Sequence, residues 1–336
     1  MIRFFLLLFL FNGLILQASA VEDPAGEDAV HWLERMNHSV LTLSYEGCFV
    51  YLSGRSLEAM RIRHQIVDGE PRESLRSLNG VPREVIRDAH TLTIITQVNG
   101  REQRISQPST EKFSPMKPLS TASLRRHYRM VLGEAARIAD RYGRVVLLLP
   151  RDDLRYGYRL VLDQQSALPL DLTVLDGSGD LVSRIMLTNL TVAETGKPVG
   201  QGSEENAATA QTVSLQPAGG EEKIASPATQ SAASVPADPE AGSRWNLQEL
   251  PRGFVLVSHK HGEAGHQEHF VFSDGLATIS AYLEPLSEGD EPFEGETSLG
   301  SINALGVSME GEQLTVVGEV PHKTLRLIAG ALKREE

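Results

Sequence analysis

The stretch MRIRHQIV at residues 60–67 decides the fold of the first part of this chain. Its even-numbered positions are mostly apolar, and its odd-numbered positions are mostly polar. Alternation with a period of two is typical of a β-strand that buries one face. The turn dipeptide Asp68-Gly69 follows directly. We therefore expect the chain to fold back here as an antiparallel hairpin.

The same rhythm continues on both sides of this stretch. Further turn dipeptides occur at 79–80, 99–100 and 176–177, between short runs of strand-forming residues. The expected strands are 45–52, 60–67, 82–87, 91–98, 101–106, 135–139, 145–149, 158–162, 170–174 and 181–190. Apolar residues at helical spacing predict helices at 27–41 and from 120 or 121 to 132. The pattern of residues 22–193 thus predicts one large, strongly curved antiparallel sheet with helices. The mouth of such a curved sheet can hold an apolar ligand.

The composition changes after this first domain. Residues 194–243 are rich in Ala, Ser, Gln, Pro, Gly and Thr and contain no aromatic residue. Such a segment cannot bury enough apolar surface to offset its ordering entropy, so we expect a flexible linker. Residues 244–336 predict a smaller α+β domain, with strands near 254–258, 269–273, 277–282 and 314–320 and a helix near 323–333. The expected fold class is therefore α+β, with two domains.

The first twenty residues are typical of a secretory signal peptide. Arg3 is followed by an apolar run at 4–17 and by the small residues Ala18-Ser19-Ala20. A run of about 14 residues is short for a membrane span, which takes about 20. We expect a mature, soluble chain that begins near Val21 and works outside the cytoplasm, because no later run reaches about 18 apolar residues.

The net charge and the cysteine content narrow the function classes. The formal net charge is −12. A negative charge of this size argues against binding to nucleic acid and against simple electrostatic adsorption to anionic lipid. The chain has one cysteine, Cys48, so it cannot form an internal disulfide. This thiol is either redox-sensitive or, as a small apolar side chain on a strand, structural.

The sequence predicts no enzyme. We find no GxSxG, HExxH, Walker A, GxGxxG or CxxC motif. His259, His261, His266 and His269 form the best cluster, and His-x-His on a strand places two rings on one face. The alternative is an exposed hairpin around Gly262–Gly265, and no carboxylate or cysteine lies at a familiar ligand spacing. We therefore expect no metal and no cofactor, and we read Asp152-Asp153 as solvated turn residues.

Basic residues gather in the first domain of this acidic chain. One interpretation is a local positive surface that binds phosphate groups or an acidic peptide. The alternative is a solvated outer face of the sheet, where these residues form ordinary ion pairs. The residues concerned are Arg61, Arg63, Arg72, Arg76, Arg83, Arg87, Arg101, Arg104, Arg125 and Arg126.

Several peptides together resemble the MucB/RseB family. In the first domain they are YEGCFVY (45–51), MRIRH (60–64), NGVPREVIR (79–87), ARIA (136–139), 152–160 and LPL (168–170). In the second they are LPRGF (250–254), VFSDGLA (271–277) and GEVP (318–321). The matches run in order from about 30 to 330 and skip only the expected linker. In two places the chain departs from the family: its linker is longer, and Cys48 stands where a small polar residue is expected.

The resemblance implies a periplasmic regulator of an envelope-stress sigma factor. Members of the family bind the periplasmic part of a membrane-spanning anti-sigma factor and shield it from the site-1 protease. Their large domain is similar to the lipoprotein carrier LolA, an unclosed barrel that accepts acyl chains. Lipid or lipopolysaccharide binding would release the partner, and no catalysis is implied. The alternatives are a periplasmic lipid or lipoprotein carrier, and a secreted hydrolase that rests only on the histidines. The sequence leaves open whether the chain forms a homo-oligomer.

Candidate binding residues follow from strand alternation and the expected curvature. We expect the lipid pocket to be lined by Phe49, Tyr51, Met60, Ile62, Ile94, Leu147, Leu160 and Leu172, with ordinary core residues as the alternative. For the peptide partner, the candidates are Arg83, Arg87, Phe254, Phe270 and Phe272.

Overall fold

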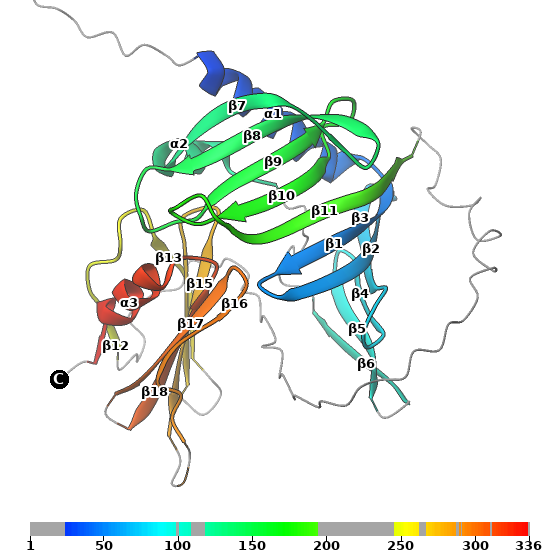
Figure 1. The fold of residues 1–336 in the computed structure, drawn as a ribbon. Helices are drawn as coiled ribbons and strands as arrows, with labels where there is room; N and C mark the ends of the chain where they lie inside the picture. Colours follow the sequence, from blue (N-terminus) through cyan, green and yellow to red (C-terminus); the bar gives the residue numbers. More distant parts are fainter. Residues whose placement is uncertain are drawn as a thin grey trace, which may run out of the picture.

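The computed structural model describes residues 24–98, 101–108, 118–193, 245–261, 267–286, 289, 291–309 and 311–334. The expected signal peptide (1–20) and the expected linker (194–243) lie outside the described residues. Two large antiparallel sheets with separate cores, one two-stranded sheet and a few helices make up the described part (Figure 1). This arrangement confirms the expected α+β class. No helix in these ranges is both long enough and apolar enough to cross a membrane.

The first domain is built on one eleven-stranded sheet. Its strand order is β6-β5-β4-β3-β2-β1-β11-β10-β9-β8-β7, and all neighbouring strands are antiparallel. The end strands β6 and β7 are not paired with each other, so the sheet is curved but unclosed. The strands are β1 (Tyr45–Ser53), β2 (Ser56–Val67), β3 (Glu70–Ser77), β4 (Arg83–Arg87), β5 (Thr91–Val98), β6 (Arg101–Pro108), β7 (Tyr128–Ile138), β8 (Arg141–Pro150), β9 (Gly157–Asp163), β10 (Pro169–Leu175) and β11 (Leu181–Val192).

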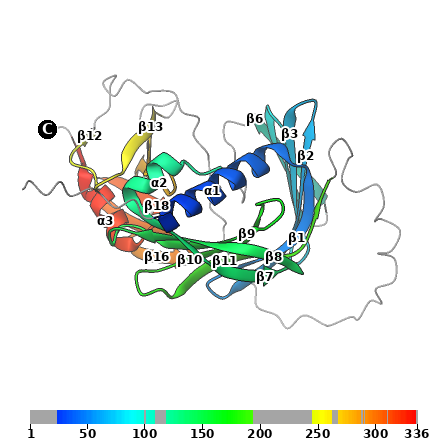
Figure 2. The same ribbon diagram turned by 90° about the horizontal axis from the view of Figure 1, so that it is seen from above.

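Helix α1 (Pro24–Thr42) lies inside the curve of this sheet, against β7 and β8 (Figure 2). The helix forms because apolar residues recur every three or four positions and so line one side. That side is buried in the core of the sheet through Val30, Leu33, Met36 and Val40. The expectation of a helix at 27–41 is confirmed.

Helix α2 (Thr121–His127) ends earlier than the sequence predicts. Ser120 caps its first turn, where the hydroxyl accepts a hydrogen bond from the Ser123 amide at 3.4 Å. The predicted end at Leu132 is wrong, because strand β7 begins at Tyr128. From there burial alternates with period two: Tyr128 and Met130 are buried, and Arg129 between them is exposed. This alternation outweighs the helical spacing that relates Leu124 to Leu132.

The second domain contains a six-stranded antiparallel sheet in the order β13-β14-β15-β18-β17-β16. Helix α3 (His322–Ala331) packs on β17 and β18 through Leu325 and Ile328. A short pair of strands, β12 with β19, joins the two ends of the domain. The strands are β12 (Trp245–Leu247), β13 (Val255–His261), β14 (Glu268–Ser273), β15 (Thr278–Pro285), β16 (Gly295–Leu299), β17 (Ile302–Met309), β18 (Glu312–Gly318) and β19 (Leu332–Arg334).

Two strands carry almost no hydrophobic pattern, and sequence reasoning missed them. The β3 segment EPRESLRS has a single large aliphatic residue, Leu75, and β16 is exposed along its whole length. The register of β3 is set by the preceding turn, where Asp68 and Gly69 have φ angles of 54° and 82°. Pairing to a well-patterned neighbour, rather than their own alternation, holds these segments as strands.

Candidate functional site

One row of apolar side chains crosses the sheet from its core to its free edge. Residues directly opposite each other in neighbouring antiparallel strands share a face. The register pairs Ile62 with Leu75, Leu75 with Val85, Val85 with Ile94, and Ile94 with Ile105. We name these five residues the apolar row. Exposure rises along it, from 0 % at Ile62 and 8 % at Leu75 to 55 % at Ile105. The row is therefore open to solvent on the β4–β6 side.

The other apolar candidates on this face lie deeper. Phe49, Met60 and Leu160 are buried in the core that also holds α1. Tyr51 and Leu172 are partly buried and pack against the same core. Their side chains fill this end of the face, as the alternative of ordinary core residues anticipated. The solvent-accessible part of this apolar face therefore lies nearer Ile94 and Ile105 than Phe49.

Leu147 does not share this face. The register pairs Leu147 with Arg159, and Arg159 with Thr173, on the opposite and more polar side of the sheet. Its neighbours Val146 and Leu148 are the fully buried residues of this strand. The predicted lining role of Leu147 is therefore wrong: a continuous apolar run cannot show from its sequence which alternate residues face inward.

A polar row runs beside the apolar row on the same face. It comprises Tyr45, His64, Glu73 and Arg87, each opposite the next in β1 to β4. The rings of Tyr45 and His64 stack with centroids 4.9 Å apart, and His64 Nδ1 lies 3.4 Å from a Glu73 carboxylate oxygen. Burial, and then the nearby Glu73 charge, raise the pKa of Tyr45. The row places titratable groups beside an apolar surface.

The two arginines predicted to contact a partner flank the apolar row. Arg83 and Arg87 lie two residues either side of Val85 on β4, so all three share a face. Arg83 is 3.5 Å from the Glu58 carboxylate, and both side chains are 43 % exposed. Cationic groups thus lie at both sides of an accessible apolar strip.

Several other arginines form ordinary ion pairs. Arg63 lies 3.1 Å and Arg61 3.9 Å from the Glu46 carboxylate, on the opposite face of the sheet from the apolar row. Arg104 lies 3.6 Å from Glu102. For these residues the structure favours the second reading of the basic cluster, a solvated face with ion pairs.

The three phenylalanines predicted to contact a partner are core residues of the second domain. Phe254, Phe270 and Phe272 are 4 %, 2 % and 0 % exposed. Side chains with so little exposure offer no surface to a peptide, so this prediction is wrong. The period-two pattern around Phe270 and Phe272 reflects packing in the core of the second domain instead.

The two domains are joined through Arg155, whose side chain is fully buried. Its guanidinium donates to the Asp274 carboxylate at 2.6 Å and to the Arg252 carbonyl at 2.8 Å, and it also pairs with Asp152. It lies 4.8 Å from the centre of the Phe254 ring. Burial, and then the Arg155 charge, lower the pKa of the neighbouring His127.

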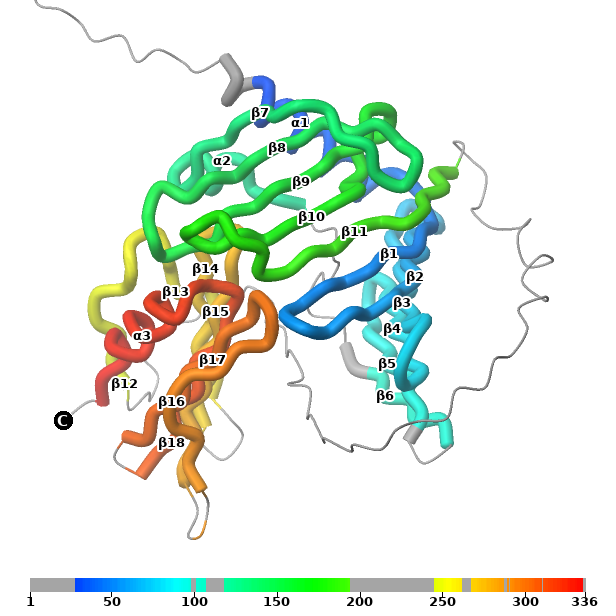
Figure 3. The backbone as a smooth tube through the Cα atoms, in the orientation of Figure 1, coloured from blue at the N-terminus to red at the C-terminus, as the bar shows by residue number. Residues whose placement is uncertain are grey.

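Further contacts extend the junction. Asn303 donates to the Tyr156 hydroxyl at 2.7 Å, and the Thr324 hydroxyl donates to the Leu154 carbonyl at 2.7 Å. The β1–β2 turn meets the β16–β17 turn (Figure 3), where a methyl group on Gly300 would overlap Ser53. Residues 151–156 therefore serve as the connector that positions the second domain.

Sequence reasoning missed this connector. Asp152 and Asp153 do lie in a turn, as expected, but Asp152 pairs with Arg155, and Asp153 pairs with Lys323 of the second domain.

A local signal existed for the polar row, since His64 occupies an apolar register position of its strand. For Arg155 no local pattern could show that its partner lies 119 residues away.

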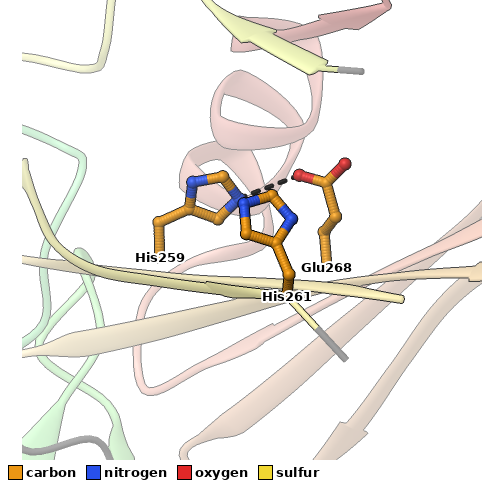
Figure 4. Close-up of side chains that lie close together, drawn as sticks. All are labelled: His259, His261 and Glu268. Carbon is orange, nitrogen blue, oxygen red and sulfur yellow. Dashed lines mark hydrogen bonds and ion pairs between the residues drawn. The ribbon is translucent and has the colours of Figure 1, made fainter. Parts of the chain in front are cut away.

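The histidine cluster is partly brought together. His259, His261 and Glu268 have potential ligand atoms within 4.8 Å of one another (Figure 4). His269 points to the other face, where it stacks on Tyr282 at 4.2 Å and burial lowers its pKa to about 4. His266 and the expected hairpin tip Gly262–Gly265 lie outside the described residues.

Comparison with known proteins agrees with the residue-level resemblance. The models of the MucB/RseB N-terminal domain and the MucB/RseB C-terminal domain match residues 28–218 and 239–333. The sigma factor AlgU regulatory protein MucB of Pseudomonas aeruginosa is 30 % identical, over 96 % of each chain. The sigma-E factor regulatory protein RseB of Escherichia coli K12 is 24 % identical, over 96 % of this chain and 95 % of its own.

Solved structures add the fold. MucB in complex with MucA(peri) aligns with a TM-score of 0.63 at 25 % identity, covering 92 % of this chain and 100 % of that one. The Pseudomonas aeruginosa MucA/MucB complex gives a TM-score of 0.65 at 26 % identity, covering 92 % and 99 %. With both domain models matched and both sheets in place, the chain belongs to the MucB/RseB family.

Proposed function

We propose that this chain regulates an envelope-stress sigma factor from the periplasm, by binding the periplasmic part of a membrane-spanning anti-sigma factor. The observation that carries the proposal is the end-to-end likeness to a sigma factor regulatory protein, together with the likeness to MucB in its complex with MucA(peri). A bound, covered segment cannot enter the active site of a protease. Binding would therefore protect the anti-sigma factor from proteolysis.

The same face supports a role in lipid sensing. An acyl chain laid along the exposed part of the apolar row would be removed from water at about 25 cal/mol per Å² of apolar area. Arg83 and Arg87 beside it can pair with the phosphate of a lipid or lipopolysaccharide head group. They can equally pair with an acidic peptide. Lipid and partner would then compete for one surface, so that lipid binding releases the partner.

Partner binding is tested by isothermal titration with the purified periplasmic region of the anti-sigma factor from the same genome. We expect micromolar or tighter affinity. The R83A/R87A double variant should weaken it severalfold, and R61A/R63A on the opposite face should leave it unchanged. No binding at micromolar concentration would contradict the proposed function, and an unchanged affinity in R83A/R87A would remove only these two contacts.

Lipid binding has a matched pair of variants on a single strand. Ile94 lies in the apolar row, and its neighbour Ile95 points to the opposite face with similar partial burial. Serine at Ile94 and Ile105 should reduce the acyl species retained in native mass spectrometry, and I95S should not. Transfer of lipid to an acceptor membrane without any anti-sigma binding would instead favour the second candidate, a periplasmic lipid or lipoprotein carrier.

A further inference from the structure

We propose that His259, His261 and Glu268 form a binding site for one divalent transition-metal ion such as Zn²⁺. The site lies at the hairpin of β13 and β14 and is separate from both the apolar row and the domain junction. It adds a ligand class that the proposed regulatory function neither requires nor explains.

The strand geometry places the three ligands together. His259 and His261 are two residues apart on β13, so their rings leave the same face of the strand. The register pairs His261 with Glu268 of β14, which brings a carboxylate to that face. No sequence spacing within one strand reveals this carboxylate, because it arrives through the antiparallel pairing. The arrangement in Figure 4 shows the three side chains turned toward one another.

Two of the three ligands are already held in place. His259 Nε2 lies 2.8 Å from a Glu268 carboxylate oxygen, and these side chains are only 5 % and 6 % exposed. The His259 ring also stacks on Phe270, with centroids 3.9 Å apart and an interplanar angle of 14°. Packing therefore fixes His259 in a position where its ring nitrogen and the carboxylate oxygen face each other.

The third ligand can close the site by a small movement. Ligand atoms around a tetrahedral zinc ion with bonds of about 2.1 Å lie about 3.4 Å apart. Here all three lie within 4.8 Å, and the exposed His261 ring already contacts the His259 ring, with centroids 4.5 Å apart, so a rotation of this side chain suffices. The ion would displace the proton shared by His259 and Glu268, releasing it to water. The solvent side then leaves room for a water ligand.

The donor set selects the type of ion. Two imidazole nitrogens and one carboxylate oxygen suit zinc, copper, nickel and iron, whereas calcium and magnesium prefer all-oxygen sites. Binding would link β13, which is one of the two edge strands of the six-stranded sheet, to its neighbour. We therefore expect the metal to stabilise the edge of the second domain.

The test is a zinc titration of the full chain made without a polyhistidine tag, followed by calorimetry and thermal unfolding. We expect one equivalent of Zn²⁺ and a rise in the unfolding temperature. H261A and E268Q should each weaken binding about tenfold or more and remove the thermal effect. The control H90N changes an exposed histidine of the first domain and should bind like the parent chain.

The outcomes separate a metal site from a hydrogen-bonded pair. H261A is the decisive variant, because His261 is exposed and its loss should not disturb folding; unfolding without metal verifies this. No zinc uptake by the parent chain, or affinity within a factor of two in both H261A and E268Q, would overturn the proposal. His259 and Glu268 would then serve only as a structural pair. Since anti-sigma binding is measured separately, either proposal can fail alone.

Discussion

Arg155 carries a charge into the junction between the domains, with no exposed side-chain area. A buried ion pair adds little stability compared with a well-packed apolar pair. Removing one partner is nevertheless strongly destabilising, because it leaves an uncompensated buried charge. The neighbouring pair of Lys323 and Asp153 crosses the same junction in solvent, with side chains 50 % and 71 % exposed. The junction thus offers a buried and an exposed ion pair for direct comparison.

Alanine at Arg155 should lower the free energy of unfolding by about 3–5 kcal/mol, because Asp274 would remain buried without its cation. K323A should cost about 1 kcal/mol or less, since its ion pair is solvated. Urea denaturation of both variants measures the difference. Equal effects would show that the buried pair does not hold the junction.

Asp163 provides a test that depends on pH. Burial would raise the pKa of its carboxyl, but hydrogen bonds from Arg141 and Ser166, at 2.7–2.9 Å, outweigh this and lower it. A folded-state pKa below the unfolded value of about 3.9 adds stability that is present above that pH and is lost as the pH falls further.

We expect D163N to be about 2 kcal/mol less stable than the parent chain at pH 7, because it loses charged hydrogen bonds. The gap should narrow as the pH falls through the folded-state pKa, where the parent carboxyl also becomes neutral. Denaturation curves at pH 7 and at acid pH measure this difference in the free energy of unfolding. A difference that stays constant with pH would contradict the lowered pKa of Asp163.

At the scale of elements, most of the chain's patterned segments were predictable, although the partly patterned β17 was missed, and its unpatterned segments were not. The helix at 27–41 and the strand at 60–67 follow from periods of 3.6 and two, because a single buried face specifies each. Strands β3 and β16 exist through pairing with neighbours, which leaves little trace in their own residues. The end of α2 was misplaced because the two periods compete near Tyr128.

Gly253 lies in the turn that leads into β13 and meets the connector. Its φ angle is +89°, and a methyl group there would lie 2.4 Å from a His127 ring carbon and 2.5 Å from an Arg155 nitrogen. G253A should therefore destabilise the chain by more than backbone strain alone, which costs about 1–3 kcal/mol.

The control is G69A. Gly69 has a similar φ of +82°, but open space surrounds its missing side chain. Thermal unfolding should show a clearly larger loss for G253A. If the two variants behave alike, close approach at the junction has no energetic role.

For the whole molecule, the junction predicts that the two domains stay associated after the chain between them is cut. A protease site introduced within residues 194–243 allows this cleavage. Size-exclusion chromatography of the cut protein should show one species, held by the contacts of Arg155, Asn303 and Thr324. The cut R155A variant should separate into two. Separation of the cut parent chain would mean that these contacts are too weak to position the second domain.

The fold class was predictable at this scale, and the site was predictable only in part. Strand alternation and turn dipeptides indicated an antiparallel sheet, and seven of the eight pocket candidates share its apolar face, Leu147 being the exception. Whether a residue on that face is filled or accessible depends on where α1 lies, which alternation does not encode. The Arg155–Asp274 pair and the His261–Glu268 pairing both depend on contacts that form only after the chain has folded.

Among the described residues, the large sheet ends in β6 and β7, each of which pairs with another strand on one side alone. The outward amides and carbonyls of β6 could recruit a strand from another molecule. Its residues Arg101, Glu102 and Arg104 are charged and exposed, which discourages such pairing. The opening that exposes Ile105 therefore brings a risk of aggregation, and charge along the rim counters it.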